Sequence, residues 1–286
     1  MLLLKLDNLI EGQVIKRPSV YVKSPYVADI KCNESNKILL AHTASLGCCG
    51  LSDVNATVLM TISIESKTKP KNQVNLKCTH TIYLSILKNK DTELIIGIHP
   101  KLAEKLVESA LNNNYLSKLQ NCKRYQRETP IFIKDKVDSR FDFTGMDQDG
   151  IPFIMEVKNV PLADYEDINS KERCNFDFEE RDFNSKVAYF PDGFRKKTSE
   201  PISPRALKHI RELTLIKKET KIRCIMCYVI QRTDVNRFQP SVIDPIYREA
   251  FIKAVETGVE IITMVVSWNR EGEAYFVRDD LPITPF

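Results

Sequence analysis

Hydrophobic and polar residues alternate in short runs along the first part of the chain, to about residue 90. β-Branched and aromatic side chains dominate these runs, and turn residues separate them, as in SVYVKS, YVADIKC, KILLAH, TVLMTISI and HTIYLSIL. A period of two over a few residues is typical of half-buried strands. Five or so short strands without a strong helix predict a small barrel or sandwich over residues 1–90, and an OB-like β-barrel is one candidate.

The pattern changes after residue 91, where helical and strand periods alternate. Leu102, Leu106 and Ala110 share one side of HPKLAEKLVESALNNN, and two further helices are predicted at SPRALKHIRELTLIKKE and DPIYREAFIKAVETG. Strand patterns lie between them, in PIFIKDKVDSRFDFTGM, GIPFIMEVKNV, KIRCIMCYVIQR and VEIITMVVSW. This alternation predicts an α/β domain over residues 91–286, with a mixed sheet flanked by helices.

One segment of the second domain lacks a sustained apolar period. Residues 163–185 read ADYEDINSKERCNFDFEERDFNS and are rich in acidic side chains. A long stretch of this kind within a compact domain is typical of a surface insertion. We expect its phenylalanines to order it in part.

Two charges interrupt the apolar strand FIMEVKNV, where Glu156 and Lys158 lie two residues apart. Burial of either charge is costly unless a partner or a ligand compensates for it. The turn signal MDQDG precedes this strand, and a hairpin centred on Asp149 places Asp142 opposite Glu156. Because residues two apart share a face, the hairpin predicts Asp142, Glu156 and Lys158 on one face of the sheet.

Two facing carboxylates repel each other, so they suggest a cation between them. Asp and Glu oxygens are ligands that Mg²⁺ prefers, and a neighbouring lysine can orient a water or stabilise charge on a phosphate. Phe141 and Val157 are expected on the opposite face of the hairpin. The spacing alone leaves an alternative open, in which Lys158 simply pairs with the two acids at a solvated strand face.

An Asp followed on the next strand by Glu-x-Lys resembles the PD-(D/E)xK nuclease motif. The surrounding sequence is more specific, because SRFDF, FIMEVKNV, AYFPDG, RALKHIREL, YVIQRTDVNRF and IDPIYREAFIKAVETGVEI occur in this order. Together with HTASLG and KLVESAL, they resemble the sugar fermentation stimulation protein (SfsA) family over nearly the whole chain. The resemblance implies an OB-like N-terminal domain, a PD-(D/E)xK-like C-terminal domain and a role in DNA binding.

The resemblance also implies roles for individual residues. Asp142 and Glu156 would ligate Mg²⁺ or Mn²⁺, with Glu108 as an outer ligand, and Lys158 would position the attacking water. Gln231, on the following core strand, would support a water or a phosphate. A solvated helix position for Glu108 and a structural amide for Gln231 remain as alternatives.

The implied activity is metal-dependent hydrolysis of phosphodiester bonds in DNA, as in an endodeoxyribonuclease. The alternative is a non-catalytic, sequence-nonspecific DNA-binding or regulatory protein of the same family. The sequence does not separate single-stranded from double-stranded DNA, and it leaves a homodimer open.

Basic residues gather before and within the predicted helix that begins at Ser203-Pro204. They are Arg195, Lys196, Lys197, Arg205, Lys208 and Arg211. A helix N-terminus flanked by cations favours a phosphate, and such contacts give salt-dependent affinity without base specificity. We therefore expect DNA at this helix. A solvated basic face is the alternative, and the net charge of +4 permits either.

The remaining polar residues point to structure rather than to chemistry. Eight cysteines are dispersed along the chain, and Cys224 and Cys227 fall on opposite faces of a strand. This favours reduced thiols in a cytoplasmic or nuclear compartment, and not a secreted protein. No apolar run has the length of a membrane span, so no membrane contact is expected. His42, His80 and His99 are scattered, and we interpret them as structural.

Overall fold

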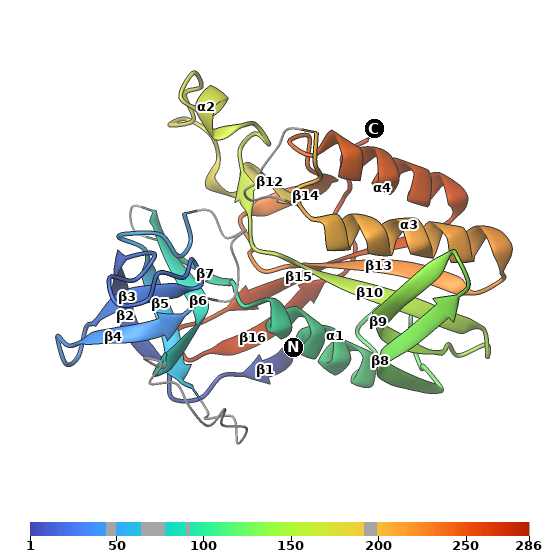
Figure 1. Ribbon diagram of the computed structural model, residues 1–286, viewed down its shortest axis with the longest axis horizontal. Coiled ribbons are helices and arrows are strands. Elements are labelled where there is room, and N and C mark those ends of the chain that lie inside the picture. The colour runs from blue at the N-terminus through green and yellow to red at the C-terminus, as the bar shows by residue number, and fades with distance from the viewer. Residues whose placement is uncertain (44–49, 64–77, 90–91, 192–198, 286) are drawn as a thin grey trace.

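The short strands of the N-terminal part close on themselves (Figure 1). The computed structural model describes residues 1–286 except 44–49, 64–77, 90–91, 192–198 and 286. The strands of this part are β2 (Ile10–Lys16), β3 (Val27–Cys32), β4 (Ile38–His42), β5 (Thr57–Ile62), β6 (His80–Asn89) and β7 (Thr92–Gly97). They pair in the order β4-β3-β2-β5-β6-β7, and a parallel pairing of β4 with β6 closes five of them into a ring.

Alternate side chains of these strands fill the interior of the ring. Val14, Ile30, Val58 and Ile82 are buried in one hydrophobic cluster. Gly12 allows two strands to approach closely, because a Cβ atom there would lie 2.5 Å from Cγ2 of Ile30. The period of two in the sequence therefore accounts for this core.

A seven-stranded mixed sheet forms the second part, as the alternating pattern predicts. Its strands are β1 (Leu2–Lys5), β8 (Arg124–Ile133), β9 (Val137–Met146), β10 (Pro152–Val160), β13 (Arg223–Ile230), β15 (Glu260–Trp268) and β16 (Glu273–Arg278). They lie in the order β1-β16-β15-β13-β10-β9-β8. The central strands β10, β13 and β15 run parallel, and the other neighbours pair antiparallel.

Helices cover both faces of this sheet (Figure 1). Helix α1 (Pro100–Asn112) packs on one face, whereas α3 (Pro204–Glu219) and α4 (Pro245–Thr257) lie side by side on the other. Helix α3 begins as predicted, because the Ser203 side chain accepts a hydrogen bond from the backbone N–H of Ala206 at 3.4 Å. The central strands β10, β13 and β15 are therefore buried on both faces, as is typical of parallel strands.

The two cysteines of β13 confirm the predicted alternation. Cys224 lies in the cluster beneath α3 and α4, and Cys227 lies in the cluster beneath α1. Burial raises the pKa of both thiols, to about 12 for Cys224. Neither is therefore a reactive thiolate.

The boundary expected at residue 90 does not match the strand pairing. Strand β1 pairs with β16, so the chain begins in the second sheet before it enters the ring. Strand β7 pairs with β6, so the hairpin of the ring continues to Gly97. The six-stranded sheet of the N-terminal part therefore extends past residue 90 through β7, and the first residues belong to the other sheet.

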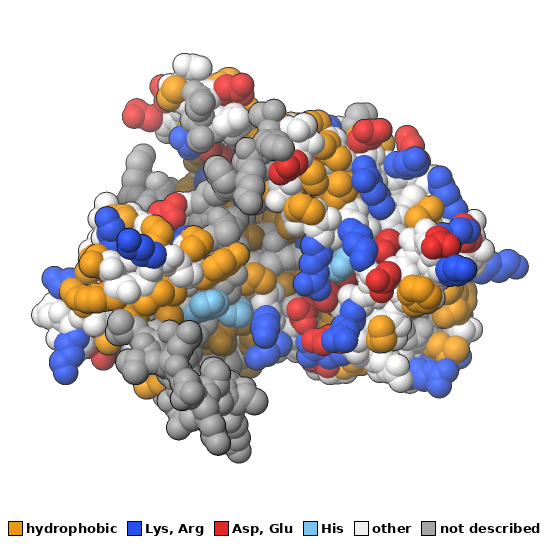
Figure 2. All heavy atoms as spheres, viewed as in Figure 1, with side chains coloured by type: hydrophobic (Ala, Val, Ile, Leu, Met, Phe, Trp, Pro, Cys, Tyr) orange, Lys and Arg blue, Asp and Glu red, His pale blue; other side chains and the backbone are white. Residues whose placement is uncertain are grey.

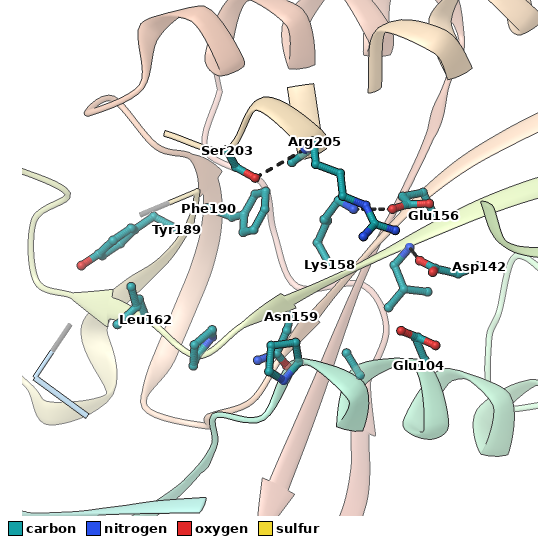
Figure 3. A pocket seen from close by; sticks show the side chains of 15 residues that line it. Glu104, Asp142, Glu156, Lys158, Asn159, Leu162, Tyr189, Phe190, Ser203 and Arg205 are labelled. Atoms are coloured by element: carbon teal, nitrogen blue, oxygen red, sulfur yellow. Dashed lines mark hydrogen bonds and ion pairs between the residues drawn. The ribbon is translucent and has the colours of Figure 1, made fainter. Parts of the chain in front are cut away.

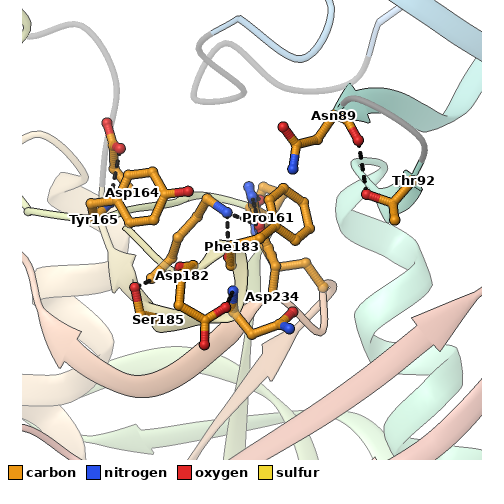
Figure 4. A network of polar contacts seen from close by, with 12 residues as sticks. Asn89, Thr92, Pro161, Asp164, Tyr165, Asp182, Phe183, Ser185 and Asp234 are labelled. Atoms are coloured by element: carbon orange, nitrogen blue, oxygen red, sulfur yellow. Dashed lines mark hydrogen bonds and ion pairs between the residues drawn. The ribbon is translucent and has the colours of Figure 1, made fainter. Parts of the chain in front are cut away.

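The segment 163–185 leads into a three-stranded sheet of β11 (Ala163–Asp164), β12 (Lys186–Phe190) and β14 (Val235–Pro240). It also contains α2 (Ser170–Arg173) and the 3₁₀ turn η1 (Phe183–Ser185). The ammonium of Lys186 anchors its end, 2.9 Å from the Asp234 carboxylate and 3.6 Å from the centre of the Phe183 ring. Figure 4 shows Tyr165, Phe183 and Asp234 around this contact.

No helix among the described residues is both long and apolar enough to cross a membrane.

Candidate metal-binding active site

The β9–β10 hairpin brings Asp142 and Glu156 together, as the count about the turn predicts. The final ladder pair joins Met155 to Phe143, so the next position on each strand holds Glu156 and Asp142. Oδ2 of Asp142 accepts a hydrogen bond from the backbone N–H of Val157 at 2.7 Å. This bond orients one oxygen of Asp142 toward β10.

The side chain of Phe141 does not lie where strand alternation predicts it. Phe143 and Val157 belong to the cluster beneath α1, whereas Phe141 packs beneath α3, with its ring centroid 5.7 Å from that of His209. Strict alternation would put both phenylalanines on one face, so β9 leaves the regular pleat at Asp142. The prediction is confirmed for Val157 and wrong for Phe141.

Glu156 is 2% exposed and contacts two basic side chains. Its Oε1 atom contacts both Nζ of Lys158 and Nδ1 of His209, whereas no described residue gives its buried Oε2 atom a hydrogen bond. Burial by itself raises the pKa of this carboxyl group, but Lys158 and His209 outweigh that effect and hold the pKa below its ordinary value. Glu156 is therefore an ionised carboxylate with one oxygen left for a ligand.

The sequence interpretation missed His209, as it missed Glu104 and Asn159 of the cavity. His209 lies on α3 three residues after Ala206 and four before Leu213, and all three are buried. That spacing places His209 on the inner side of the helix. A histidine in the apolar stripe of a helix, opposite a charged strand, was the signal available.

Asp142 has the opposite shift. Burial, and then the charge of Glu156, raise the pKa of Asp142 to about 7, although Lys158 acts against them. Ionisation of both carboxylates is therefore costly in the protein alone. A cation held between them would lower that cost.

These side chains line one cavity of about 300 Å³ between α1 and α3. Figure 3 shows Asp142, Glu156 and Lys158 in it, with Glu104 on α1 and Arg205 on α3. Strand β10 therefore supplies the floor, and a helix on each side supplies one charged residue.

The structure places Glu108 outside this cavity. Its carboxylate forms an ion pair with Arg127 at 2.7 Å and is 3.5 Å from the Tyr125 hydroxyl. Glu104, one helical turn earlier, also contacts Arg127 but lines the cavity. The acid that α1 contributes to the site is thus Glu104, because the rotation of the helix turns Glu108 toward β8.

Gln231 lies one layer behind the cavity. Its buried amide donates to Oδ1 of Asn159 at 2.7 Å and accepts from the indole N–H of Trp268 at 2.8 Å. Asn159 lines the cavity, whereas Gln231 does not. Gln231 therefore acts on the site only through Asn159.

The described basic residues of the predicted DNA-binding set do not lie at one site. Arg205 is exposed and lines the cavity, whereas Arg211 lines a separate groove between α3 and α4. Lys208 donates to the backbone carbonyl of Asp138. Three of the predicted residues lie outside the described residues, and these are Arg195, Lys196 and Lys197.

Comparison with known proteins identifies the family. Residues 101–272 match the family described as "Sugar fermentation stimulation protein RE domain". The chain belongs to the SfsA family. Its relatives include sugar fermentation stimulation protein homologs from Alteromonas mediterranea, 29% identical over 258 residues and 89% of each chain, and from Prochlorococcus marinus strain MIT 9301. The latter is 28% identical over 272 residues, which cover 93% of this chain and 92% of the relative.

A solved SfsA structure has the same fold. The structure of Pyrococcus furiosus SfsA in complex with Ca²⁺ superposes with a TM-score of 0.72, at 19% identity and with complete coverage of both chains. The arrangement of ring, mixed sheet and helices is therefore that of an SfsA protein.

The cavity of this SfsA-family chain has a donor set that suits a hard divalent cation. Glu104, Asp142 and Glu156 supply carboxylate oxygens, and Oε2 of Glu156 is buried without a partner in the described part of the chain. Among the described residues, no three His, Cys, Asp or Glu side chains already converge closely enough to coordinate one ion. Binding would therefore need a side chain such as Glu104 to move toward the other two acids.

Proposed function

We propose that this SfsA-family protein hydrolyses phosphodiester bonds of DNA in a reaction that depends on Mg²⁺ or Mn²⁺. The proposal rests above all on Glu156, which lines the cavity with Asp142 and Lys158 and whose buried Oε2 atom has no hydrogen-bond partner among the described residues. An ionised acid, a second acid of raised pKa and a lysine in one cavity suit metal-assisted hydrolysis. The proposal treats the closed ring as an OB-like barrel and the seven-stranded sheet as PD-(D/E)xK-like.

Asp142 and Glu156 would hold the metal, and Glu104 would complete the set. When bound, a divalent ion polarises a phosphate and lowers the pKa of a bound water. The Ca²⁺ in the Pyrococcus furiosus SfsA structure supports a divalent-cation site in the family. Because Asp142 and Glu156 lie on adjacent strands, the distance between their carboxylates is nearly constant.

Lys158 and Arg205 would handle the substrate. Oε1 of Glu156 holds the Lys158 ammonium in the cavity, where the ammonium can orient a water or stabilise charge on a phosphate oxygen. Arg205 lies in the first turn of α3, and a helix N-terminus with an arginine favours a phosphate. Asn159, fixed by Gln231, offers a further hydrogen bond to the substrate or a water.

One observation favours the second candidate, a DNA-binding protein that does not cut. Lys158 and His209 both contact Oε1 of Glu156, and a backbone N–H already holds Asp142. These contacts partly satisfy the acids without a metal. A cytoplasmic location belongs to either proposal, since dispersed free thiols suit a reducing compartment.

A cleavage assay on purified protein separates the two. Labelled single- and double-stranded DNA is incubated with Mg²⁺ or Mn²⁺ and with the unaltered protein, Glu156→Gln or Lys158→Met. Lys221→Met is the control, because Lys221 is exposed and outside the cavity. We expect cleavage by the unaltered protein and by the control, with a loss of at least about a hundredfold in the other two. Absence of cleavage by all four proteins, with DNA binding retained, would sink the enzyme and leave the binding protein.

A further inference from the structure

Four aromatic rings form two stacked pairs at the junction of the ring and α1. Tyr26 stacks on His42 with 6.4 Å between ring centroids, and Tyr83 stacks on His99 with 4.7 Å between centroids. The two pairs are near each other, since His42 pairs with Thr81 of β6 and Tyr83 lies two residues further along the same face of that strand. We name this set, Tyr26, His42, Tyr83 and His99, the ring row.

Backbone pairing and hydrogen bonds position the residues of the ring row. His42 is the last residue of β4 and lies beside Thr81 of β6, and the N–H of Thr43 donates to the carbonyl of Tyr26 at 2.8 Å. The N–H of Ile98 donates to the carbonyl of Tyr83 at 2.9 Å, which fixes the approach to α1. The rings therefore come from β4, from β6, from the residue before β3 and from the residue before α1.

Several properties of the ring row are those of a ligand surface. Tyr26 is 40% exposed, and His42 and Tyr83 are half-buried. His99 is 9% exposed, and its Nδ1 atom has no hydrogen-bond partner among the described residues. Figure 2 shows histidine side chains at the surface of this face of the molecule, with basic side chains nearby. A buried polar atom left without a partner is costly, so a ligand at this atom would stabilise the site.

The rings are suited to bases rather than to phosphates. Burial lowers the pKa of His42, and burial together with His42, Lys101 and Lys105 lowers that of His99 to about 4. Both imidazoles are therefore neutral near pH 7 and present flat faces without charge. Lys101 and Lys105 are exposed on α1 and can meet the backbone phosphates.

Helix α1 leads from the ring row to the cavity. His99 precedes Pro100, and Pro100, Ala103 and Glu104 of α1 line the cavity. The helix rises about 7.5 Å between His99 and Glu104, which is about the length of two stacked nucleotides. A strand on the ring row would thus reach the carboxylates within a nucleotide or two.

We propose that the ring row is a stacking platform for unpaired bases, so that the DNA entering the cavity is single-stranded where it crosses the barrel. This inference rests on the proposed function, since it names the form of its substrate. Stacking on aromatic side chains needs open base faces, which a paired duplex does not offer.

Fluorescence anisotropy in EDTA tests the platform without cleavage. The probes are a labelled twelve-nucleotide thymidine strand, the same backbone with abasic sites and a twelve-base-pair duplex. We expect the unaltered protein to prefer the thymidine strand to the abasic one by about fivefold or more. Tyr26→Ala and His42→Ala should each remove most of this preference, whereas Tyr26→Phe should keep it. Phe132→Ala is the matched control, because Phe132 is 73% exposed on β8 and is not part of the ring row.

Equal affinity of the unaltered protein for thymidine and abasic strands would overturn the platform, as would unchanged binding by Tyr26→Ala and His42→Ala. The cleavage assay keeps the two proposals distinct. Cleavage of duplex DNA without any base-dependent binding refutes the platform and leaves the nuclease. Base-dependent binding without cleavage refutes the nuclease and retains the platform as a single-strand binding site. Absence of binding to every probe refutes the platform, and absence of cleavage as well refutes the nuclease.

Discussion

His209 and Glu156 contact each other across the interface between α3 and β10, although 53 residues separate them in the chain. Because Glu156 is ionised, Nδ1 of His209 must carry the hydrogen atom and donate the hydrogen bond to Oε1. Lys158 donates to the same oxygen. The two donors leave Oε2 of Glu156 as the only oxygen of this carboxylate without a partner in the described part of the chain, and so fix which atom faces a ligand.

Loss of His209 should weaken metal binding. His209→Ala removes one of the two donors that orient Glu156, and outer-shell substitutions of this kind cost roughly tenfold to a hundredfold in metal affinity or activity. His209→Gln, whose amide can donate to Glu156, should recover part of the loss. Calorimetric titration with Ca²⁺ is the measurement.

Thr214→Ala is the control for His209, because Thr214 is also buried on α3 and donates only to the helix carbonyl of Ile210. It should lower stability without changing metal affinity. If both variants changed the affinity equally, the role of His209 would be general packing.

Asp142→Asn should stabilise the metal-free protein at alkaline pH. The raised pKa of Asp142 means that the folded state holds its proton up to about pH 7, whereas the unfolded state loses it near pH 4. Stability from this group therefore falls as the pH rises through that window, and at pH 8 the neutral amide should gain about 1–2 kcal/mol. Urea denaturation in EDTA should show the gain at pH 8 and little at pH 4. Asp138→Asn, at an exposed position of the same strand, should show no such difference.

Metal affinity should fall on acidification through pH 7. The metal needs ionised Asp142, and protons compete for that carboxylate below its pKa of about 7. Each pH unit below 7 should then weaken Ca²⁺ binding by up to about tenfold. Titrations at pH 6, 7 and 8 measure the slope. The slope should vanish in Asp142→Asn, and an equal slope in that variant would assign the proton to another group.

Arg205 should contribute more to DNA affinity than Arg211. Arg205→Ala removes a cation from the cavity wall, so the slope of log affinity against log salt should decrease by about one. Arg211 lies in the groove between α3 and α4, so Arg211→Ala should change the slope less. Binding at several salt concentrations measures both slopes, and a larger change for Arg211 would move the DNA to that groove.

Lys186→Met should loosen the 163–185 insertion. The ammonium of Lys186 is buried against Asp234 and the Phe183 ring, and its loss should cost roughly 1.5–3 kcal/mol, because Asp234 keeps its ion pair with Arg232. Trypsin should then cut the insertion faster. Arg181→Gln breaks an exposed ion pair with Glu166 and should change the free energy of unfolding by less than about 1 kcal/mol.

The local features of the site followed from the sequence. A turn of known length fixes the register of a hairpin. The position of Asp142 opposite Glu156 could therefore be predicted from the MDQDG turn and the number of residues on each side of it. The position of Lys158 followed from the strand period, and the start of α3 followed from Ser203 and Pro204. These relationships span few residues and depend on backbone geometry alone.

The tertiary structure decided what joins elements that are distant in sequence. The rotation of α1 about its axis is set by packing, and it brings Glu104 rather than Glu108 to the cavity. The contact of His209 with Glu156 requires α3 to lie over β10, and β1 joins the far sheet by pairing with β16. The ring row likewise exists only because β4, β6 and the start of α1 meet in space. Alternation and turn signals specify neighbours along the chain, whereas the packing of whole elements selects these partners.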